Sequence, residues 1–277
     1  MSKREVQFSS GNLVLRGELY LTDRKSAPAI LVCHAMHAEG FRWLPLYRLF
    51  AERAAEHGFA CLLFDFRGCG KSEGEFDYGW GEQEDARAAF EFLLAQEEID
   101  STCAFIVGRS LGGTVALYSL LGDPRAKGFA LWATPPDHRL NVRQFIVQRY
   151  GRLRYLLFYI LSYIDQFHDV TRAMKIEVFG LTLRLKDLRR KLMALNSGKL
   201  LSNIEHPPIL LLIGDRDEYV ALREAENFQK SLRKEGFSLS ILRTGHTFKG
   251  AEDEAISITL GWFEGLLRSR VHPSPSS

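Results

Sequence analysis

The sequence has few cysteines, and their spacing gives no sign that they act together. Only four occur among 277 residues, and no pair has the two-residue separation of a metal-binding or redox motif. Cys33, Cys61 and Cys103 lie in apolar runs, and Cys69 lies in a glycine-rich stretch. Neither a zinc site nor a disulfide framework is predicted, and we expect four reduced thiols.

Long apolar runs are also lacking. No run reaches the length of about 18 apolar residues that a membrane-spanning helix needs, and the first residues, MSKREVQFSS, lack the apolar stretch of a secretory signal. The phosphate-binding patterns GxxxxGK[ST] and GxGxxG cannot be written in this sequence, and no motif indicates nucleic-acid binding. We therefore expect a cytoplasmic protein with no nucleic-acid partner.

Charge is unevenly distributed along the chain. The whole sequence carries a net charge of +2, but residues 137–203 hold 13 Lys and Arg against 5 Asp and Glu, which is +8 and leaves −6 elsewhere. We call residues 137–203 the cap segment. Its excess charge suits an anionic substrate or an anionic membrane surface, with an ordinary solvated face as the alternative.

Short, wholly apolar runs alternate with helix-length segments. Such runs are typical of strands covered on both faces of a parallel sheet, and residues 14–21 alternate like an antiparallel strand. The pattern predicts a doubly wound, mostly parallel α/β core made of residues 1–136 and 204–270. Strands are predicted at 14–21, 29–33, 60–64, 104–107, 129–132, 209–213 and 239–242, and helices at 44–56, 82–96, 111–121, 221–235 and 252–268.

The alternation breaks once, in the cap segment. No clear strand is recognised there, and the text RYGRLRYLLFYILSYIDQF reads as aromatic and aliphatic helix with interspersed arginines. We predict a helical insertion over one edge of the core. Residues 271–277, which include HPSPSS, are expected to form a disordered tail.

A serine lies where a predicted buried strand meets a predicted helix. The sequence Gly108-Arg109-Ser110-Leu111-Gly112 follows the run FIV and leads into a helix-length segment. A sharp strand-to-helix turn of this kind lifts the serine above the sheet, and the free N–H groups of the helix N-terminus then face a developing oxyanion. Ser110 is therefore a candidate nucleophile.

An acid and a histidine follow this serine in chain order, each after a predicted strand. Asp215 and Asp217 lie in GDRDEYV, and His246 lies in TGHTF. Since parallel strands end at one edge of a sheet, all three motifs should meet there. A serine hydroxyl needs a base to remove its proton and an acid to orient that base, and this set supplies both.

These motifs resemble those of the α/β-hydrolase superfamily of serine hydrolases. The resemblance covers nearly the whole chain outside the cap segment. In that family the acid usually stands three residues after a strand-end glycine, which favours Asp217 after Gly214, with Asp215 as the alternative. The stretch FDFRGCGKSEG also resembles the family's D-x-R-G-x-G-x-S, and we interpret it as structural support for the site.

The resemblance also gives a role to the stretch VCHAMHAEGF, residues 32–41. In the family, the residue after the histidine donates a backbone N–H to the oxyanion hole, together with the residue after the nucleophile. Carried over, the donors are Ala35 and Leu111, although the family's glycine is an alanine here, so Met36 stays open as an alternative to Ala35. His34 is expected to brace the turn rather than bind a metal.

The resulting hypothesis is a carboxylic ester hydrolase that works through an acyl-enzyme. Ser110, His246 and Asp217 form the triad, Ala35 and Leu111 form the oxyanion hole, and no metal or organic cofactor is implied. The substrate is expected to be a small acyl ester or thioester under an apolar cap. Open alternatives are a thioesterase, a lysophospholipase or an aminopeptidase on the same triad, and a non-catalytic binding scaffold. The oligomeric state is left open.

Overall fold

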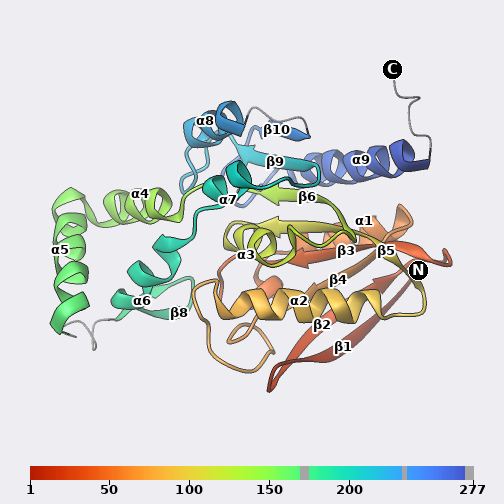
Figure 1. Ribbon diagram of the computed structural model, residues 1–277, viewed down its shortest axis with the longest axis horizontal. Helices are drawn as coiled ribbons and strands as arrows, with labels where there is room; N and C mark the ends of the chain where they lie inside the picture. The colour runs from red at the N-terminus through yellow and green to blue at the C-terminus, as the bar shows by residue number, and fades with distance from the viewer. Residues whose placement is uncertain (169–174, 233–235, 272–277) are drawn as a thin grey trace.

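The computed structural model describes residues 1–168, 175–232 and 236–271. Its main feature is one eight-stranded sheet, whose arrangement can be followed in Figure 1. The strand order is β1-β2-β4-β3-β5-β6-β9-β10. The β1–β2 and β2–β4 pairs are antiparallel, and the other neighbours in this sheet are parallel. The strands are β1 (Ser2–Ser10), β2 (Leu13–Leu21), β3 (Ala27–Cys33), β4 (Ala60–Phe64), β5 (Ile99–Arg109), β6 (Ala126–Trp132), β9 (Ile209–Gly214) and β10 (Phe237–Leu242).

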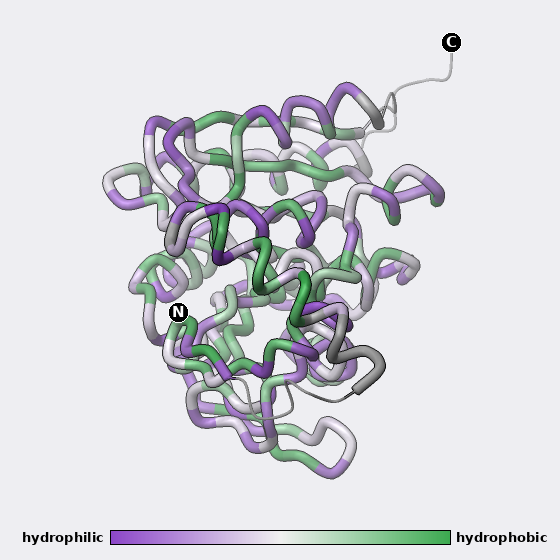
Figure 2. Tube along the Cα trace, turned by 90° about the vertical axis from the view of Figure 1, so that its left-hand side faces the viewer, coloured by the Kyte–Doolittle hydropathy of each residue, from purple (hydrophilic) through white to green (hydrophobic). Residues whose placement is uncertain are grey.

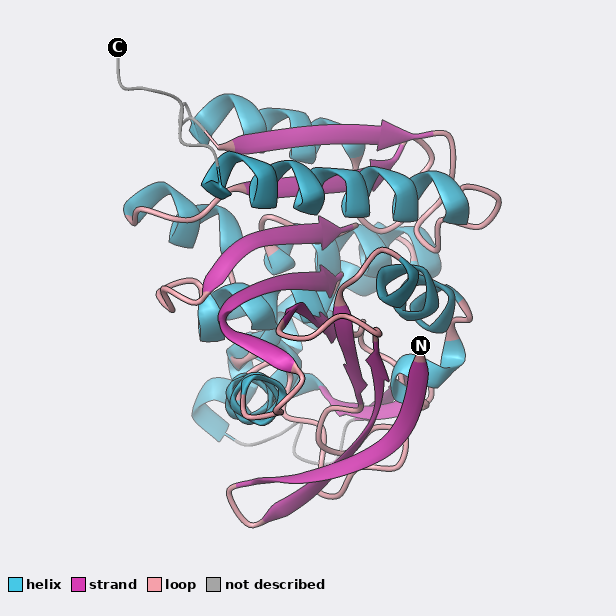
Figure 3. Cartoon of the chain, turned by 90° about the vertical axis from the view of Figure 1, so that its right-hand side faces the viewer, coloured by secondary structure: helices cyan, strands magenta, loops and turns pink. Residues whose placement is uncertain are grey.

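Helices cover both faces of this sheet, as the uninterrupted apolar runs predict. In β3, Ile30 and Val32 pack into one buried cluster, while Leu31 and Cys33 pack into the other. A strand in this position has no polar face because each side meets a helix layer. Helices α1 (Leu46–Glu56) and α9 (Glu252–Val271) supply one layer, and α2 (Gly81–Leu94), α3 (Leu111–Leu120) and α8 (Leu222–Leu232) supply the other. The predicted doubly wound sheet is confirmed (Figure 3).

The sheet begins one strand earlier than predicted. β1 pairs with β2 along its whole length, from Ser2 opposite Leu21 to Ser10 opposite Leu13. The strand lies at the edge of the sheet and is largely exposed, with only Val6 and Phe8 packing partly against the core. Because one face and one edge of β1 are open to solvent, its sequence is mostly polar, and the apolar pattern of a strand is therefore missing.

The cap segment lies between β6 and β9 and is not wholly helical. The prediction that it contains no strand is wrong, because β7 (Lys175–Val178) and β8 (Leu181–Arg184) form an antiparallel hairpin. Phe179 and Gly180 make the turn with φ of 52° and 75°, the backbone signature of a tight hairpin. The remaining elements are α4 (His138–Tyr150), α5 (Arg152–His168), α6 (Leu185–Arg190), the 3₁₀ turn η2 (Leu192–Ala194) and α7 (Ser197–Asn203).

The C-terminal end differs slightly from the expected tail. Helix α9 extends to Val271, so the first residue of the predicted disordered segment is helical, and residues 272–277 lie outside the described residues. All four cysteines are buried and free, which agrees with the expectation of reduced thiols. Among the described helices, none has the length and apolar character needed to cross a bilayer.

Candidate active site

Ser110 occupies a sharp and strained turn. It follows the last residue of β5 and precedes the first residue of α3, and its backbone adopts φ 50° and ψ −122°. A non-glycine residue in this region costs about 1–3 kcal/mol and persists only where the surrounding structure enforces it. Two backbone hydrogen bonds do so here, from the Ser110 N–H to Trp132 O at 2.8 Å and from the Gly113 N–H to Ser110 O at 3.1 Å.

The glycines on either side of Ser110 are required by close backbone approach. A Cβ on Gly108 would overlap the backbone of Gly113, and a Cβ on Gly112 would overlap the carbonyls of Cys33 and His34. The turn therefore brings the start of α3 directly against the end of β3. This contact places the nucleophile candidate beside the loop that holds Ala35 and Met36.

His246 and Asp217 meet at the same edge of the sheet. The Nδ1 atom of His246 lies 2.9 and 3.0 Å from the two carboxylate oxygens of Asp217. Asp217 also accepts hydrogen bonds from the N–H groups of Tyr219 and Val220, both at 2.9 Å, which fix the carboxylate. Asp215, the alternative acid, is exposed and pairs instead with Arg216 at 3.4 Å.

The environment of His246 favours its neutral form. Burial lowers its pKa from the ordinary value of 6.5, the carboxylate of Asp217 opposes this shift, and the positive charge of Arg109 adds to it. When Nδ1 carries the proton and donates a hydrogen bond to the Asp217 carboxylate, Nε2 is left as an acceptor. That is the form in which imidazole can remove a proton from an alcohol.

The N–H of Ala35 is already engaged. It donates to the hydroxyl oxygen of Tyr47 at 2.9 Å, and both residues are buried. This corrects the expectation that Ala35 faces an oxyanion, because an N–H held by a buried partner would have to break that bond first. The neighbouring Met36 N–H and the Leu111 N–H have no acceptor within the described part of the chain.

His34 braces the loop that follows β3, as predicted. Its Nδ1 lies 2.6 Å from the carbonyl of Ala35, and its Nε2 accepts a hydrogen bond from the Phe66 N–H at 3.0 Å. Burial lowers its pKa, so the ring stays neutral. His37 stacks on Trp43 with centroids 4.7 Å apart. No cluster of three or more potential metal ligands occurs among the residues that the structure describes.

The candidate residues share one cavity of about 240 Å³. Ser110, Leu111, Met36 and His246 all line it, together with side chains from the cap segment. Phe179, at the tip of the β7–β8 hairpin, also lines the cavity, and its carbonyl accepts a hydrogen bond from the Ala38 N–H at 3.0 Å. The unpredicted hairpin thus contacts the loop after β3 and closes part of the site.

His138 is a second histidine in this cavity, and its sequence context does not distinguish it from the other histidines. Its Nε2 lies 2.8 Å from the hydroxyl of Thr114, and burial lowers its pKa to about 3. No carboxylate accompanies it in this contact, so it lacks the acid partner that orients His246. Its position at the start of α4 shows that the cap segment contributes polar as well as apolar atoms to the cavity.

Arg109 is a residue of the site that sequence reasoning missed. It stands between Gly108 and Ser110, is fully buried, and donates from Nη2 to the carbonyl oxygen of His246. Its guanidinium also lies 5.4 Å from the centroid of the Trp43 ring, and its charge acts on Tyr47, the residue that holds Ala35. The turn Gly108–Gly112 follows the pattern G-x-S-x-G, in which Arg109 occupies a variable position. This pattern could not predict the role of Arg109, because its contacts come from distant loops.

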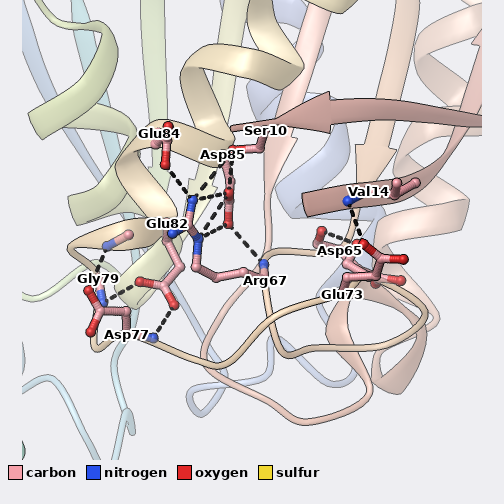
Figure 4. A network of polar contacts seen from close by, with 12 residues as sticks. Ser10, Val14, Asp65, Arg67, Glu73, Asp77, Gly79, Glu82, Glu84 and Asp85 are labelled. Carbon is pink, nitrogen blue, oxygen red and sulfur yellow. Dashed lines mark hydrogen bonds and ion pairs between the residues drawn. The ribbon is translucent and has the colours of Figure 1, made fainter. Parts of the chain in front are cut away.

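The D-x-R-G-x-G-x-S stretch takes part in a network of polar contacts that includes Asp65 and Arg67 (Figure 4). Asp65 is buried, forms an ion pair with Arg42 and accepts the N–H of Lys71 at 3.0 Å, while a Cβ on Gly70 would overlap its carboxylate. Arg67 pairs with the buried Asp85 at 2.7 Å. The charges of Asp65 and Arg67 are therefore paired with residues of neighbouring elements, which agrees with the interpretation of the stretch as structural support.

Comparisons with known proteins agree with this fold. An alpha/beta hydrolase family model matches residues 30–252. The structure of an esterase from Pyrococcus furiosus superposes with a TM-score of 0.70 at 19% identity, covering 96% of this chain and 91% of the other. The alpha/beta hydrolase GrgF from a Penicillium species gives a TM-score of 0.72 at 20% identity, covering 96% and 99%.

Two curated relatives match over shorter stretches. Quorum-quenching protein AidA of Acinetobacter baumannii is 34% identical over 126 residues, which is 44% of this chain and 40% of AidA. An uncharacterized protein of Rickettsia prowazekii is 27% identical over 51% of this chain and 59% of its own length. The matched regions therefore span only about half the length of these relatives. Because the family model covers most of the chain, the protein belongs to the alpha/beta hydrolase family.

Proposed function

We propose that the protein hydrolyses carboxylic esters through an acyl-enzyme intermediate. The single observation that supports this best is that His246, whose Nδ1 lies 2.9 Å from the Asp217 carboxylate, lines one cavity with a strained Ser110. Ser110 is the nucleophile, His246 the general base and Asp217 the orienting acid. The Met36 and Leu111 N–H groups are the oxyanion donors, with Met36 replacing Ala35.

The reaction proceeds in two halves. His246 Nε2 takes the proton of Ser110 as Oγ attacks the ester carbonyl, and the carbonyl oxygen gains the negative charge that the two N–H groups stabilise. Collapse expels the alcohol, which receives the proton from His246, and leaves Ser110 acylated. A water molecule then attacks the acylated Ser110 in the same way, with His246 as base. The acid is released and Ser110 regains its proton.

The cap segment is proposed to select the acyl group. It contributes His138, Asn141, Phe179 and Leu192 to the cavity, which is predominantly apolar and of modest size. Tyr219 from the core packs against both Phe179 and His246, with ring centroids 5.7 and 4.8 Å apart. These aromatic walls favour a compact, uncharged acyl chain at Ser110.

The leaving group is tested by comparison of substrates. Esters, thioesters and aminoacyl amides that share one short acyl chain should be measured under single-turnover conditions. For each compound, the acylation rate is divided by its uncatalysed rate of hydrolysis. The ester proposal predicts that this rate enhancement is largest for the oxygen ester. A larger enhancement with a thioester or an aminoacyl amide would assign the same triad to a thioesterase or an aminopeptidase instead.

The pH dependence of catalysis follows from the burial of His246. Only neutral His246 can act as base, and its pKa is lowered from 6.5, so kcat/KM should rise with pH and reach its plateau by about neutrality. The midpoint of the acid limb is therefore expected below 6.5. Initial rates with a neutral p-nitrophenyl ester between pH 4.5 and 8 measure it, and a midpoint well above 6.5 would contradict the assignment.

Arg109 is proposed as a positioning residue that joins the serine turn to the histidine loop. Replacing Arg109 by methionine removes the donor to the His246 carbonyl and the charge that lowers the His246 pKa. We expect kcat/KM to fall roughly 10²-fold from misplacement, with the acid limb shifted upward. Arg109→Lys, which keeps the charge, should retain the wild-type midpoint. An unshifted midpoint in a folded Arg109→Met variant would reduce Arg109 to a packing role.

A further inference from the structure

Helix α5 carries an apolar stripe that faces away from the protein. Leu153, Leu156, Leu157 and Ile160 have exposed fractions of 80%, 52%, 55% and 45%. Their spacing of i, i+3, i+4 and i+7 aligns them along one face of the helix. An exposed row of large aliphatic side chains is unusual on a monomer and marks a contact surface.

The other side of α5 is also apolar, but it is covered. Phe158 is buried and Tyr155 is partly buried, and both pack within the core cluster. The stripe is therefore not a face that the helix could turn inward, since the inward side is already occupied. Figure 1 shows α4 and α5 at the end of the molecule farthest from α9, and Figure 2 views this end directly.

Basic side chains accompany the stripe. Arg152 and Arg154 are exposed in the first turn of α5, and Arg143 is exposed on the adjoining helix α4. Tyr159 and Tyr163 are about half exposed farther along α5, and the guanidinium of Arg189 lies 5.8 and 5.1 Å from their ring centroids. These residues belong to the cap segment, whose net charge is +8.

The charge distinguishes between the possible occupants of the stripe. A second copy of the chain would bring two such arginine-bearing ends together, so like charges would oppose the contact. A bilayer with anionic headgroups instead accepts aliphatic side chains below the surface, tyrosines at the interface and arginines at the phosphates. We propose that the exposed face of α5 binds an anionic lipid surface, lying in its plane without crossing it.

This contact would orient the candidate active site. Helix α4 connects the cavity to α5, because His138 and Asn141 at its beginning line the cavity and Gly151 joins its end to α5. Docking α5 on a membrane therefore places the cap segment against the lipid. The binding step itself needs no catalysis, so it can fail or succeed independently of the proposed ester hydrolysis.

Sedimentation with vesicles tests the proposal. The full-length protein should be mixed with phosphatidylcholine vesicles, with and without phosphatidylglycerol, at low and high salt. We expect binding to the anionic vesicles that weakens as salt rises. Replacing Leu156, Leu157 and Ile160 together by serine should lower the partition coefficient at least about tenfold, and reversing Arg152 and Arg154 to glutamate should abolish the preference for phosphatidylglycerol.

Controls separate binding from folding and from self-association. Ile241→Ser, which alters an exposed aliphatic residue on β10, should bind vesicles like wild type. All variants should keep the wild-type Tm and the wild-type rate on a soluble short ester. Absence of wild-type binding to anionic vesicles, or equal binding by the triple serine variant, would overturn the proposal. The proposal would also be overturned if the wild-type protein sedimented as a dimer and the triple serine variant sedimented as a monomer.

Discussion

Replacement of Ser110 by alanine is expected to lower kcat for ester hydrolysis by about 10⁵ to 10⁶-fold, as loss of the triad nucleophile does in characterised serine hydrolases. Ser110 and His246 line the same cavity, and the strained turn at Ser110 holds its side chain at that cavity. Alanine can adopt the same backbone as serine, so the fold should persist. Initial rates with p-nitrophenyl butyrate, together with the Tm, measure both effects.

A serine in α3, the helix that follows Ser110, provides the matched control. Ser119 lies in α3 and donates its hydroxyl to Val115 O at 2.7 Å, away from the cavity residues. Ser119→Ala should leave kcat within a few fold of wild type. If Ser110→Ala retains more than a small part of wild-type turnover while Ser119→Ala is normal, the nucleophile lies elsewhere and the mechanism is wrong.

The second large effect is expected at Asp217. Asp217→Asn should lower kcat about 10⁴-fold, because the amide no longer holds the His246 ring in the tautomer with a free Nε2. The substitution preserves size, and the N–H groups of Tyr219 and Val220 can still donate to the remaining side-chain oxygen. The change should therefore appear in kcat rather than in folding.

Asp215→Asn is the direct comparison for this variant. Asp215 is exposed and its carboxylate meets only the side chain of Arg216 among the hydrogen bonds described for it, so its loss should alter kcat little. Equal damage from both substitutions would indicate a general effect on the loop after β9. Inactivation by Asp215→Asn alone would transfer the acid role to Asp215.

Most of the sheet could be predicted from sequence because its strands are covered on both faces. Runs such as 60–64 contain no charged or strongly polar residue, and that composition is typical of a strand between two helix layers. β1 escaped prediction because an exposed edge strand is mostly polar. The β7–β8 hairpin escaped because its alternation, Ile176, Val178, Leu181 and Leu183, lasts only four residues on each side and follows a long helical stretch.

The contacts of the candidate site were harder to predict than its residues. Chain order and strand ends were enough to propose Ser110, His246 and an acid in the stretch after residues 209–213, and the family's spacing favoured Asp217 over Asp215. Sequence could not decide between Ala35 and Met36, because the decision depends on Tyr47, which reaches back from α1 to take the Ala35 N–H. Arg109 escaped for the same reason, since its partner His246 is 137 positions away. Pairings between distant loops leave no local pattern.

Covalent labelling of the nucleophile tests the central claim most directly. The wild-type protein should be treated with a fluorophosphonate, and the modified peptide should be located by mass spectrometry, with the Ser110→Ala variant treated in parallel. We predict one adduct, on Ser110, and none in the variant, since phosphonylation requires a hydroxyl activated by His246. A folded wild-type protein that stays unlabelled, or that carries the adduct on another residue, would contradict the account.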